Sequence, residues 1–219
     1  MKGYIAQTKR TYSRIATQYH AEGRKYAKWY SDTLAPFERL LKKKFENPSI
    51  LDIGCGAALE LELLHKHGFS SLYGMDISPQ MLRIARKSIP SGKFYEGNIL
   101  TRRLDRKFDA IMMISLMHLL KKEDIPRALG NVRAMLADNG YFLQTVFNRR
   151  KPRMGFINKS GYGRSDVVRY VREYTMKESV QELSRNGFTV LKSYSAKYKD
   201  RNREGEKTTG WLLLIAKKD

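Results

Sequence analysis

The sequence predicts an α/β protein in which helices alternate with the strands of an open, mostly parallel sheet. Short apolar runs at 49–53, 71–75 and 108–114 are separated by segments with the length and apolar spacing of helices. The run at 108–114 is continuous, which is typical of a strand buried on both faces. Strands that alternate with helices pair in parallel through right-handed crossovers.

The elements are expected in the following order. An amphipathic helix covers 8–31, with a break near Gly23, and a second helix covers 33–46. Alternating strands and helices then follow, with strands at 49–53, 71–75, 93–96, 108–114 and 141–147 and helices at 58–67, 78–88 and 123–137. Ser78 is expected to cap its helix, and Gly140 to end the helix over 123–137. After an irregular basic stretch, a helix at 175–185 leads to an antiparallel hairpin of strands at 188–198 and 208–216, joined by a charged turn at 200–207.

Length and composition indicate one domain over residues 1–219, because 219 residues suffice for one sizeable core and no long linker interrupts the chain. No apolar run approaches the ~20 residues of a membrane span. The N-terminus lacks the apolar core of a signal peptide. The single cysteine, Cys55, cannot form an internal disulfide, and we therefore expect a cytoplasmic protein.

The formal net charge of +20 is distributed unevenly. Residues 1–47 carry 11 basic and 4 acidic side chains, residues 48–147 carry 13 and 10, and residues 148–219 carry 18 and 8. The basic excess therefore lies in the two flanks. Such flanks attract anions, including nucleic acid, phosphorylated metabolites or an acidic membrane surface. A solvated surface with no anionic partner explains the same pattern.

A strand runs into small residues and then into a helix at 50–58, in Ile-Leu-Asp-Ile-Gly-Cys-Gly-Ala-Ala. Gly54 and Gly56 would let the backbone approach a ligand closely, and the following helix N-terminus offers free N–H groups. The spacing Gly-x-Gly-x-Ala is shorter than that of dinucleotide-binding turns. A tight strand-to-helix turn without a ligand is the alternative.

Two further polar residues end the next two strands. Asp76 follows Tyr-Gly-Met, and its carboxylate can accept hydrogen bonds from two ribose hydroxyls; the alternative, a helix cap, is better filled by Ser78. Asn98 lies in Glu-Gly-Asn-Ile and offers an amide to an adenine edge, or else forms an ordinary Gly-Asn turn. Because open α/β sheets bind ligands at the carboxyl ends of their strands, these three segments predict one nucleoside site.

Four segments together resemble class I S-adenosylmethionine-dependent methyltransferases, most closely the type 11 branch: Leu-Asp-Ile-Gly-Cys-Gly at 51–56, Gly-Met-Asp-Ile-Ser at 74–78, Gly-Asn-Ile at 97–99 and Phe-Asp-Ala-Ile at 108–111. The resemblance covers residues 8–147 well and 175–216 loosely. It implies a Rossmann-like seven-stranded sheet in the order 3-2-1-4-5-7-6 with strand 7 antiparallel, helices on both faces, and S-adenosylmethionine as cofactor.

The resemblance also implies where the cofactor lies. Gly54 and Gly56 would face its methionine, Asp76 its ribose, and Asn98 with Ile99 its adenine. The cofactor-binding residues expected on this basis are Tyr12, Tyr19, Asp52, Gly54, Cys55, Gly56, Asp76, Ile77, Met81, Gly97, Asn98, Ile99 and Met113. Two positions depart from the family pattern: Ala58 stands where the family has a third glycine, and Asn98 where it usually has an aspartate.

The segment Tyr-Ser-Arg-Ile-Ala-Thr-Gln-Tyr at 12–19 resembles the helix that folds over the cofactor in this family. Residues 1–47 would form a helical cap in which Tyr12 and Tyr19 lie over the cofactor, unless both tyrosines only pack in the core. The basic insert at 148–174 would build the acceptor side, unless it is only a solvated lid. The substrate-binding residues expected there are Arg149, Tyr162, Arg164, Arg169, Tyr170 and Tyr174, since arginine pairs with phosphate or carboxylate and tyrosine stacks on planar rings.

These observations predict methyl transfer to an O or N atom of a small, anionic or aromatic molecule. His118 follows the buried strand and is the candidate general base, which a hydroxyl acceptor would need; a packing or hydrogen-bonding histidine is the alternative. No metal centre is expected. The alternatives are an RNA methyltransferase whose basic flanks hold phosphates, and a non-catalytic protein that binds the cofactor. The sequence does not define the oligomeric state.

Overall fold

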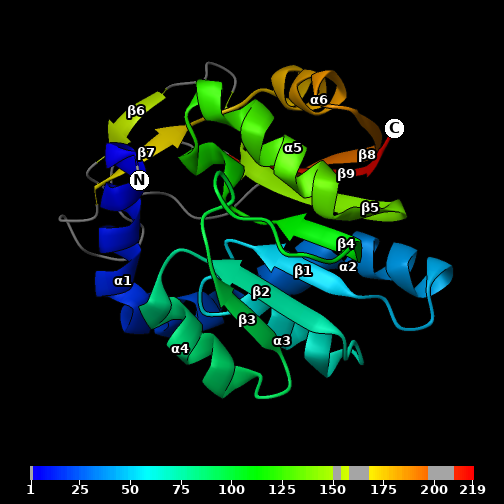
Figure 1. Ribbon diagram of the computed structural model, residues 1–219, viewed down its shortest axis with the longest axis horizontal. Helices are drawn as coiled ribbons and strands as arrows, with labels where there is room; N and C mark the ends of the chain where they lie inside the picture. Colours follow the sequence, from blue (N-terminus) through cyan, green and yellow to red (C-terminus); the bar gives the residue numbers. More distant parts are fainter. Residues whose placement is uncertain (1, 150–153, 158–167, 197–209) are drawn as a thin grey trace.

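The computed structural model describes residues 2–149, 154–157, 168–196 and 210–219. A seven-stranded sheet forms its centre in the order β3-β2-β1-β4-β5-β9-β8 (Figure 1). The first five strands in this order are parallel, and β9 runs antiparallel to both β5 and β8. The strand order and the antiparallel strand implied by the resemblance are confirmed. The strands of this sheet are β1 (Ile50–Ile53), β2 (Leu72–Asp76), β3 (Lys93–Glu96), β4 (Phe108–Met113), β5 (Leu136–Phe147), β8 (Phe188–Ala196) and β9 (Trp211–Lys218).

Helices cover both faces of the sheet (Figure 1). The helices are α1 (Gly3–Gly23), α2 (Ala27–Lys44), α3 (Leu59–Lys66), α4 (Pro79–Ser88), α5 (Ile125–Met135) and α6 (Met176–Arg185), with single 3-10 turns η1 (Arg24–Tyr26), η2 (Met117–Leu119) and η3 (Lys122–Asp124). Apolar residues of α2, α3 and α4 pack on one face, and those of α5 and α6 pack on the other. Within the described ranges, no helix is long and apolar enough to cross a membrane.

Local sequence explains where two of the helices begin. Ser78 caps α4, since its side chain accepts a hydrogen bond from the Met81 N–H at 3.2 Å, as predicted. Thr175 and Glu178 form a reciprocal capping box at the start of α6. These caps fix the helix starts directly after β2 and β7, and so help to place both segments at the same end of the sheet.

The structure corrects two sequence expectations. The stretch expected to be irregular contains a two-stranded antiparallel ribbon, β6 (Met154–Ile157) and β7 (Arg169–Arg172), whose charged ends conceal the strand pattern in the sequence. Gly140 does not end a helix: α5 ends at Met135, and β5 begins at Leu136 and includes Gly140. A Cβ on Gly140 would lie 2.8 Å from the Leu136 side chain, so close packing within the strand, rather than a helix end, explains this glycine. The expected turn at 200–207 lies outside the described residues.

Helix α1 stands across the carboxyl ends of the parallel strands (Figure 1). Polar contacts fix it to three different segments: Ser13 donates to Ser78 at 2.9 Å, Lys9 pairs with Glu96 at 2.7 Å, and the Thr11 hydroxyl donates to the Val168 carbonyl at 2.8 Å. Tyr4 and Lys2 both contact the Asp124 carboxylate of η3. The helix therefore closes one side of the space at the carboxyl ends of the strands.

Ala58 adopts a left-handed conformation, with φ 65° and ψ 34°, at the cap of α3. An L-residue in this region costs about 1–2 kcal/mol relative to the right-handed region. Glycine avoids that cost, which explains why the family pattern has a glycine at this position. The methyl group of Ala58 is fully buried in the core beneath α2 and α3, and this burial partly offsets the strain.

We predict that Ala58→Gly leaves the free energy of unfolding within about 1 kcal/mol of the wild-type value, because relief of backbone strain offsets the lost methyl burial and the added chain entropy. The matched control is Ala85→Gly, at an equally buried position inside the right-handed helix α4, which should cost at least about 1 kcal/mol. Urea denaturation of both variants measures the difference. Equal losses would show that Ala58 carries no strain.

Candidate functional site

A crevice lies between α1 and the carboxyl ends of β1, β2 and β3, and the space within it, part of which is open to solvent, amounts to about 430 Å³. Its lining residues come from α1, from the turns after these three strands, and from the segment after β4: Ile5, Thr8, Ile53, Gly54, Asp76, Ile77, Gly97, Asn98, Ile99, Leu116, Leu119 and Leu120. The three segments that the sequence analysis placed in one site therefore meet in one cavity.

The turn after β1 needs its glycines. Gly54 and Gly56 have φ values of 77° and 51°. A Cβ on Gly54 would lie 3.0–3.2 Å from the Leu116 side chain, so any larger residue would displace the segment after β4. The Gly54 N–H donates to the Met75 carbonyl at 2.6 Å, which wraps the turn around the end of β2. The turn is thus held against two neighbouring segments, with its backbone facing the crevice.

Asp76 ends β2, and its half-buried carboxylate lines the crevice. Its Oδ2 accepts from the Gly56 N–H at 3.0 Å and its Oδ1 from the Ser78 N–H at 2.8 Å. A carboxylate can accept more than two hydrogen bonds, so a ligand hydroxyl can still bind to it. Burial raises the pKa of Asp76 to about 6, although the backbone hydrogen bonds from Ser78 and Gly56 oppose the shift.

Two other acidic residues, Asp52 and Glu60, lie near the glycine turn, and Asp52 interacts electrostatically with both Glu60 and Asp76. Asp52 on β1 is buried, and its Oδ1 has no hydrogen-bond partner within the described residues. Burial, reinforced by Glu60 and Asp76, raises the pKa of Asp52 well above its usual range. Burial also raises the pKa of Glu60, in the first turn of α3, to about 7. The site therefore holds three acidic groups whose neutral form is favoured in the free protein, and a bound cation would shift them toward the ionised form.

The other end of the crevice is formed by Gly97, Asn98 and Ile99 after β3, together with Ile77. The Asn98 Oδ1 accepts from the Leu100 N–H at 3.0 Å, so Asn98 forms a local turn, the alternative to a ligand-binding role. Asn98 also lines the cavity. Its amide N–H groups and the second lone pair of Oδ1 remain able to meet a ligand.

The remaining predicted cofactor residues divide into two groups. Tyr12, Tyr19 and Met81 pack together beside the glycine turn, with the Tyr12 and Tyr19 ring centroids 5.7 Å apart. The Met81 sulfur and the Tyr19 ring would each lie 3.9 Å from a Cβ on Gly56. By contrast, Cys55 and Met113 are buried in the cores on opposite faces of the sheet and do not line the crevice.

Sequence analysis missed two groups of lining residues. Ile5 and Thr8 lie in the first turns of α1, before and at the expected start of that helix, and Leu116, Leu119 and Leu120 lie in and beside η2. Their apolar spacing is that of an ordinary core, so no local signal identifies them. Glu60 was also missed, because it looks like a favourable acidic residue in a first helical turn.

The described residues of the basic insert meet different partners. Arg149 pairs with Glu173 at 2.9 Å. Tyr170 packs edge-on against Tyr4 of α1, with ring centroids 5.8 Å apart, and Tyr174 is fully buried beneath the Arg172 guanidinium. Arg169 is buried beside η2. Tyr162 and Arg164 lie outside the described residues.

His118 lies in η2 and is buried within an aromatic cluster formed by His118, Phe147, Trp211 and Trp29. The centroid of its ring is 4.2 Å from that of Phe147 and 5.7 Å from that of Trp211, which in turn contacts Trp29 at 5.3 Å. Burial, and secondarily the nearby Arg169 charge, holds the pKa of His118 well below its usual range. The imidazole is therefore neutral, and its Nδ1 has no partner among the described residues.

A family model described as a methyltransferase domain matches residues 22–193, most of the chain. The chain belongs to this methyltransferase family. The five parallel strands of the sheet, the glycine turn after β1 and the acidic residue at the end of β2 all lie in the matched region.

Relatives and solved structures support the same assignment. A Streptomyces venezuelae dTDP-3-amino-3,4,6-trideoxy-alpha-D-glucopyranose N,N-dimethyltransferase is 32% identical over 124 residues, 56% of this chain and 51% of that protein. The chain thus spans about half the length of that relative. An S-adenosylmethionine-dependent methyltransferase from Clostridium acetobutylicum shares the fold with a TM-score of 0.69 and 17% identity, over 91% of this chain and 98% of the other. The DhpI–SAH complex does so with a TM-score of 0.70 and 18% identity, over 99% and 97%.

The residues of this methyltransferase fit S-adenosylmethionine. The cofactor carries two cationic groups, an ammonium and a sulfonium, and the acidic groups Asp52, Glu60 and Asp76 supply opposite charge at the glycine turn. The ribose has hydroxyls for Asp76, and the apolar wall of Ile77 and Ile99 suits a planar base. We infer that Asp76 holds the ribose and that Asn98 and Ile99 contact the adenine.

The pH dependence of cofactor binding follows from the raised pKa of Asp76. Folded protein holds the Asp76 proton more tightly than the unfolded chain, so this group lowers the free energy of unfolding as the pH rises from about 4 to about 6. Ribose hydroxyls need the ionised carboxylate. We therefore predict that SAH binds more tightly as the pH rises through 6, and that Asp76→Ala weakens binding ten-fold or more at pH 8, since each lost charged hydrogen bond is worth about 1.5–3 kcal/mol.

Calorimetric titration with SAH from pH 5 to pH 8 measures both effects. The variant should lose less affinity at pH 5, where the wild-type carboxyl is largely protonated. Glu96→Ala is the matched control, because Glu96 ends the neighbouring strand but is exposed and paired with Lys9. Unchanged affinity in Asp76→Ala would contradict the ribose role.

Proposed function

We propose that this S-adenosylmethionine-dependent methyltransferase transfers its methyl group to an O or N atom of a small, anionic or aromatic molecule. The observation that carries the proposal is the set of aromatic and basic residues at η2 and β7, next to the crevice. There, η2 bears His118 within the aromatic cluster, and the buried Arg169 lies beside it. A planar ring can stack on such a cluster, and a guanidinium can pair with an acidic group.

The cofactor supplies a methyl group already activated on a sulfonium. The protein therefore has to bind and align the two reactants and to exclude water from them. Apolar residues of α1 and η2, namely Ile5, Leu116, Leu119 and Leu120, provide the water-excluding walls. In our proposal residues 1–219 act as one domain, with 1–47 as the cap over the cofactor and 148–174 as the acceptor-side insert.

Relatives support an acceptor of this kind. The name of the Streptomyces relative describes N,N-dimethylation of an amino sugar attached to dTDP, an anionic small molecule. That relative matches this chain over 124 residues, and the proposal for this chain extends only to the shared chemistry of an anionic, nitrogen- or oxygen-bearing acceptor.

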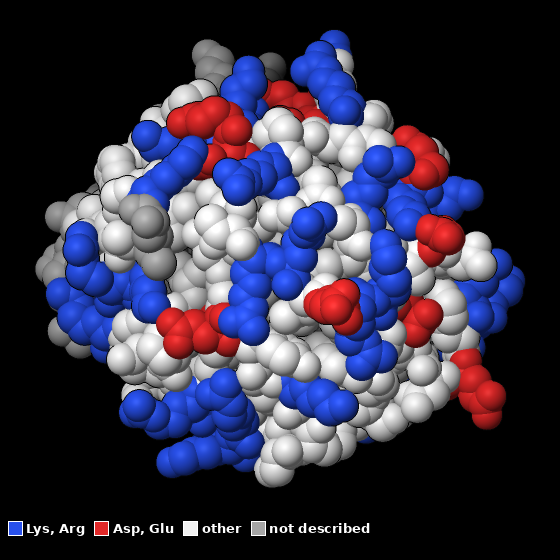
Figure 2. All heavy atoms as spheres, in the orientation of Figure 1, with Lys and Arg blue, Asp and Glu red and all other residues white. Residues whose placement is uncertain are grey.

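RNA is the second candidate acceptor, and the net charge of +20 is the observation that favours it. On the face shown in Figure 2, however, Asp and Glu side chains are interspersed among the Lys and Arg side chains over the whole surface. A surface that tracks a phosphate backbone would be expected to segregate the two charges. A non-catalytic, cofactor-binding protein is the third candidate.

Transfer of labelled methyl groups separates the three candidates. Incubation of the full chain with methyl-labelled cofactor and separate small-molecule and RNA fractions should label the small-molecule fraction. Asp76→Ala serves as the control that lowers the signal. Label in RNA that disappears steeply with salt would establish the second candidate instead, and no transfer despite tight SAH binding would establish the third.

His118 is proposed as the general base for a hydroxyl acceptor, since its imidazole is neutral and its Nδ1 has no partner among the described residues. A neutral amine needs no such base. We predict that His118→Ala slows O-methylation at least ten-fold and leaves N-methylation nearly unchanged; rates with acceptors of each kind measure the contrast. An equal loss with both kinds would assign His118 to packing against Phe147.

A further inference from the structure

Arg169 is a buried cation without an anionic partner in the described part of the chain. The residue lies at the start of β7 and is only 7% exposed, yet its Nε and Nη1 form no hydrogen bond there. An arginine remains charged at every physiological pH, so the protein cannot relieve this burial by losing a proton. A buried charge without a partner is destabilising, and native proteins pair such groups.

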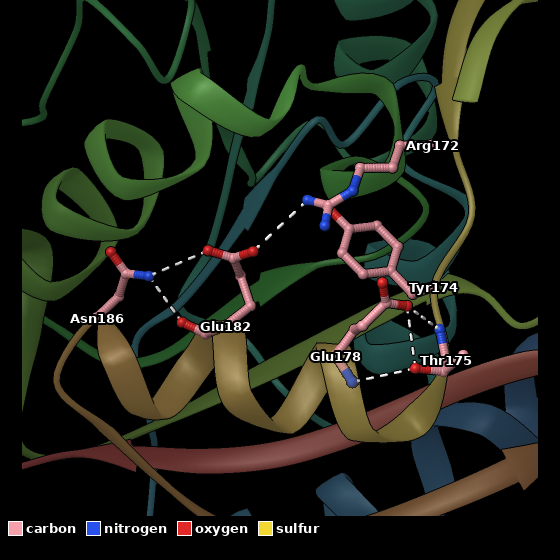
Figure 3. A network of polar contacts seen from close by, with 6 residues as sticks. All are labelled: Arg172, Tyr174, Thr175, Glu178, Glu182 and Asn186. Carbon is pink, nitrogen blue, oxygen red and sulfur yellow. Dashed lines mark hydrogen bonds and ion pairs between the residues drawn. The ribbon is translucent and has the colours of Figure 1, made fainter. Parts of the chain in front are cut away.

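Arg172, on the same strand, shows how this protein treats a structural arginine (Figure 3). Arg172 is equally buried, but its Nη1 lies 3.5 Å from the Glu182 carboxylate and 3.3 Å from the Tyr174 hydroxyl, and its guanidinium covers the Tyr174 ring at 4.5 Å. Glu182 in turn accepts from Asn186 of the same helix (Figure 3). Side chains of a strand alternate between faces, so Arg169 points away from this network and has no access to Glu182.

Arg169 lies next to the proposed methyl-transfer site. Strand β7 packs against both η2 and α1, the two segments that wall the crevice. The residue before it, Val168, accepts a hydrogen bond from Thr11 of α1. Leu116, the residue before η2, packs against Gly54, at the methionine end of the proposed cofactor site. His118 lies on η2, its Nδ1 has no partner among the described residues, and it is close enough for the Arg169 charge to act on it.

We propose that Arg169 is the residue that recognises an oxyanion, a carboxylate or phosphoryl group, on the methyl acceptor, with His118 beside it. This inference rests on the proposed function and specifies its acceptor. A guanidinium offers two parallel N–H donors to either oxyanion, which fixes orientation as well as charge. Because Nε and Nη1 have no partner among the residues that the structure describes, binding of the acceptor, rather than folding, would satisfy these donors.

The proposal predicts that stability and anion binding change in opposite directions. Arg169→Met removes an unpartnered buried charge, so the free protein should melt at least about 2 °C higher. Inorganic phosphate or acetate should raise the melting temperature of the wild-type protein, with saturation, by more than sodium chloride does at equal ionic strength. Arg169→Met should lose this rise. Whichever of the two oxyanions stabilises the wild-type protein identifies the acidic group. Arg169→Lys should keep a weakened response, since an ammonium cannot make the bidentate contact.

Two matched variants complete the experiment. Arg127→Met changes an exposed arginine of α5 and should keep the oxyanion response, which controls for the high net charge. Arg172→Met removes a buried, paired arginine and should lower the melting temperature, because Glu182 loses its partner. All measurements are made on the full chain with and without SAH, and calorimetry with SAH is run on each variant.

Three results would overturn the proposal: a wild-type protein with no oxyanion response beyond chloride, an Arg169→Met variant that melts lower and keeps the response, or one that loses SAH affinity instead. The last result would place the cofactor carboxylate, not the acceptor, at Arg169. Failure of the wild-type protein to bind SAH would instead contradict the proposed function. The oxyanion response is also measured without SAH, so it tests the role of Arg169 separately.

Discussion

The hydrogen bond from the Gly56 N–H to the Asp76 carboxylate is the contact on which the candidate site depends. Parallel pairing of β1 with β2 brings Ile53 opposite Met75, and the chain then turns over the end of β2, with the Gly54 and Cys55 N–H groups both donating to the Met75 carbonyl. The Gly56–Asp76 bond, at 3.0 Å, closes this turn. It fixes the backbone that faces the crevice and the carboxylate that lines it in a single arrangement.

This constraint explains why small residues and an acid are needed together. A Cβ on Gly54 would push against Leu116 and shift η2, and η2 carries Leu119 of the crevice and His118 of the aromatic cluster. A change at the glycine turn would therefore affect both the proposed cofactor site and the proposed acceptor site. The strained Ala58 shows that the turn tolerates a side chain one step further along, where the methyl group enters the core between α2 and α3 instead of the crevice.

The sheet could be predicted because its strands are short apolar runs between helices of regular spacing. Gly54, Asp76 and Asn98 could be placed at the crevice because glycine, acid and amide residues at strand ends are distinctive in the sequence. Prediction failed where packing selects the residue: Leu116 and Ile5 line the crevice, yet any core could contain them. The strand β7 was also missed, because the basic insert was expected to be irregular, whereas the ribbon buries Arg169 and Arg172. Whether an arginine is paired depends on residues distant in sequence, such as Glu182, and no local pattern records that.

The distribution of unbalanced charge separates the functional part of the molecule from the structural part. At the glycine turn, acidic groups have raised pKa values, and the positive charge of a bound donor would favour their ionised form. At β7, which packs against η2, the buried Arg169 has no counterion among the described residues. Burial thus disfavours the charged state in both places. In our proposal the cationic donor would offset the first imbalance and an acidic acceptor the second.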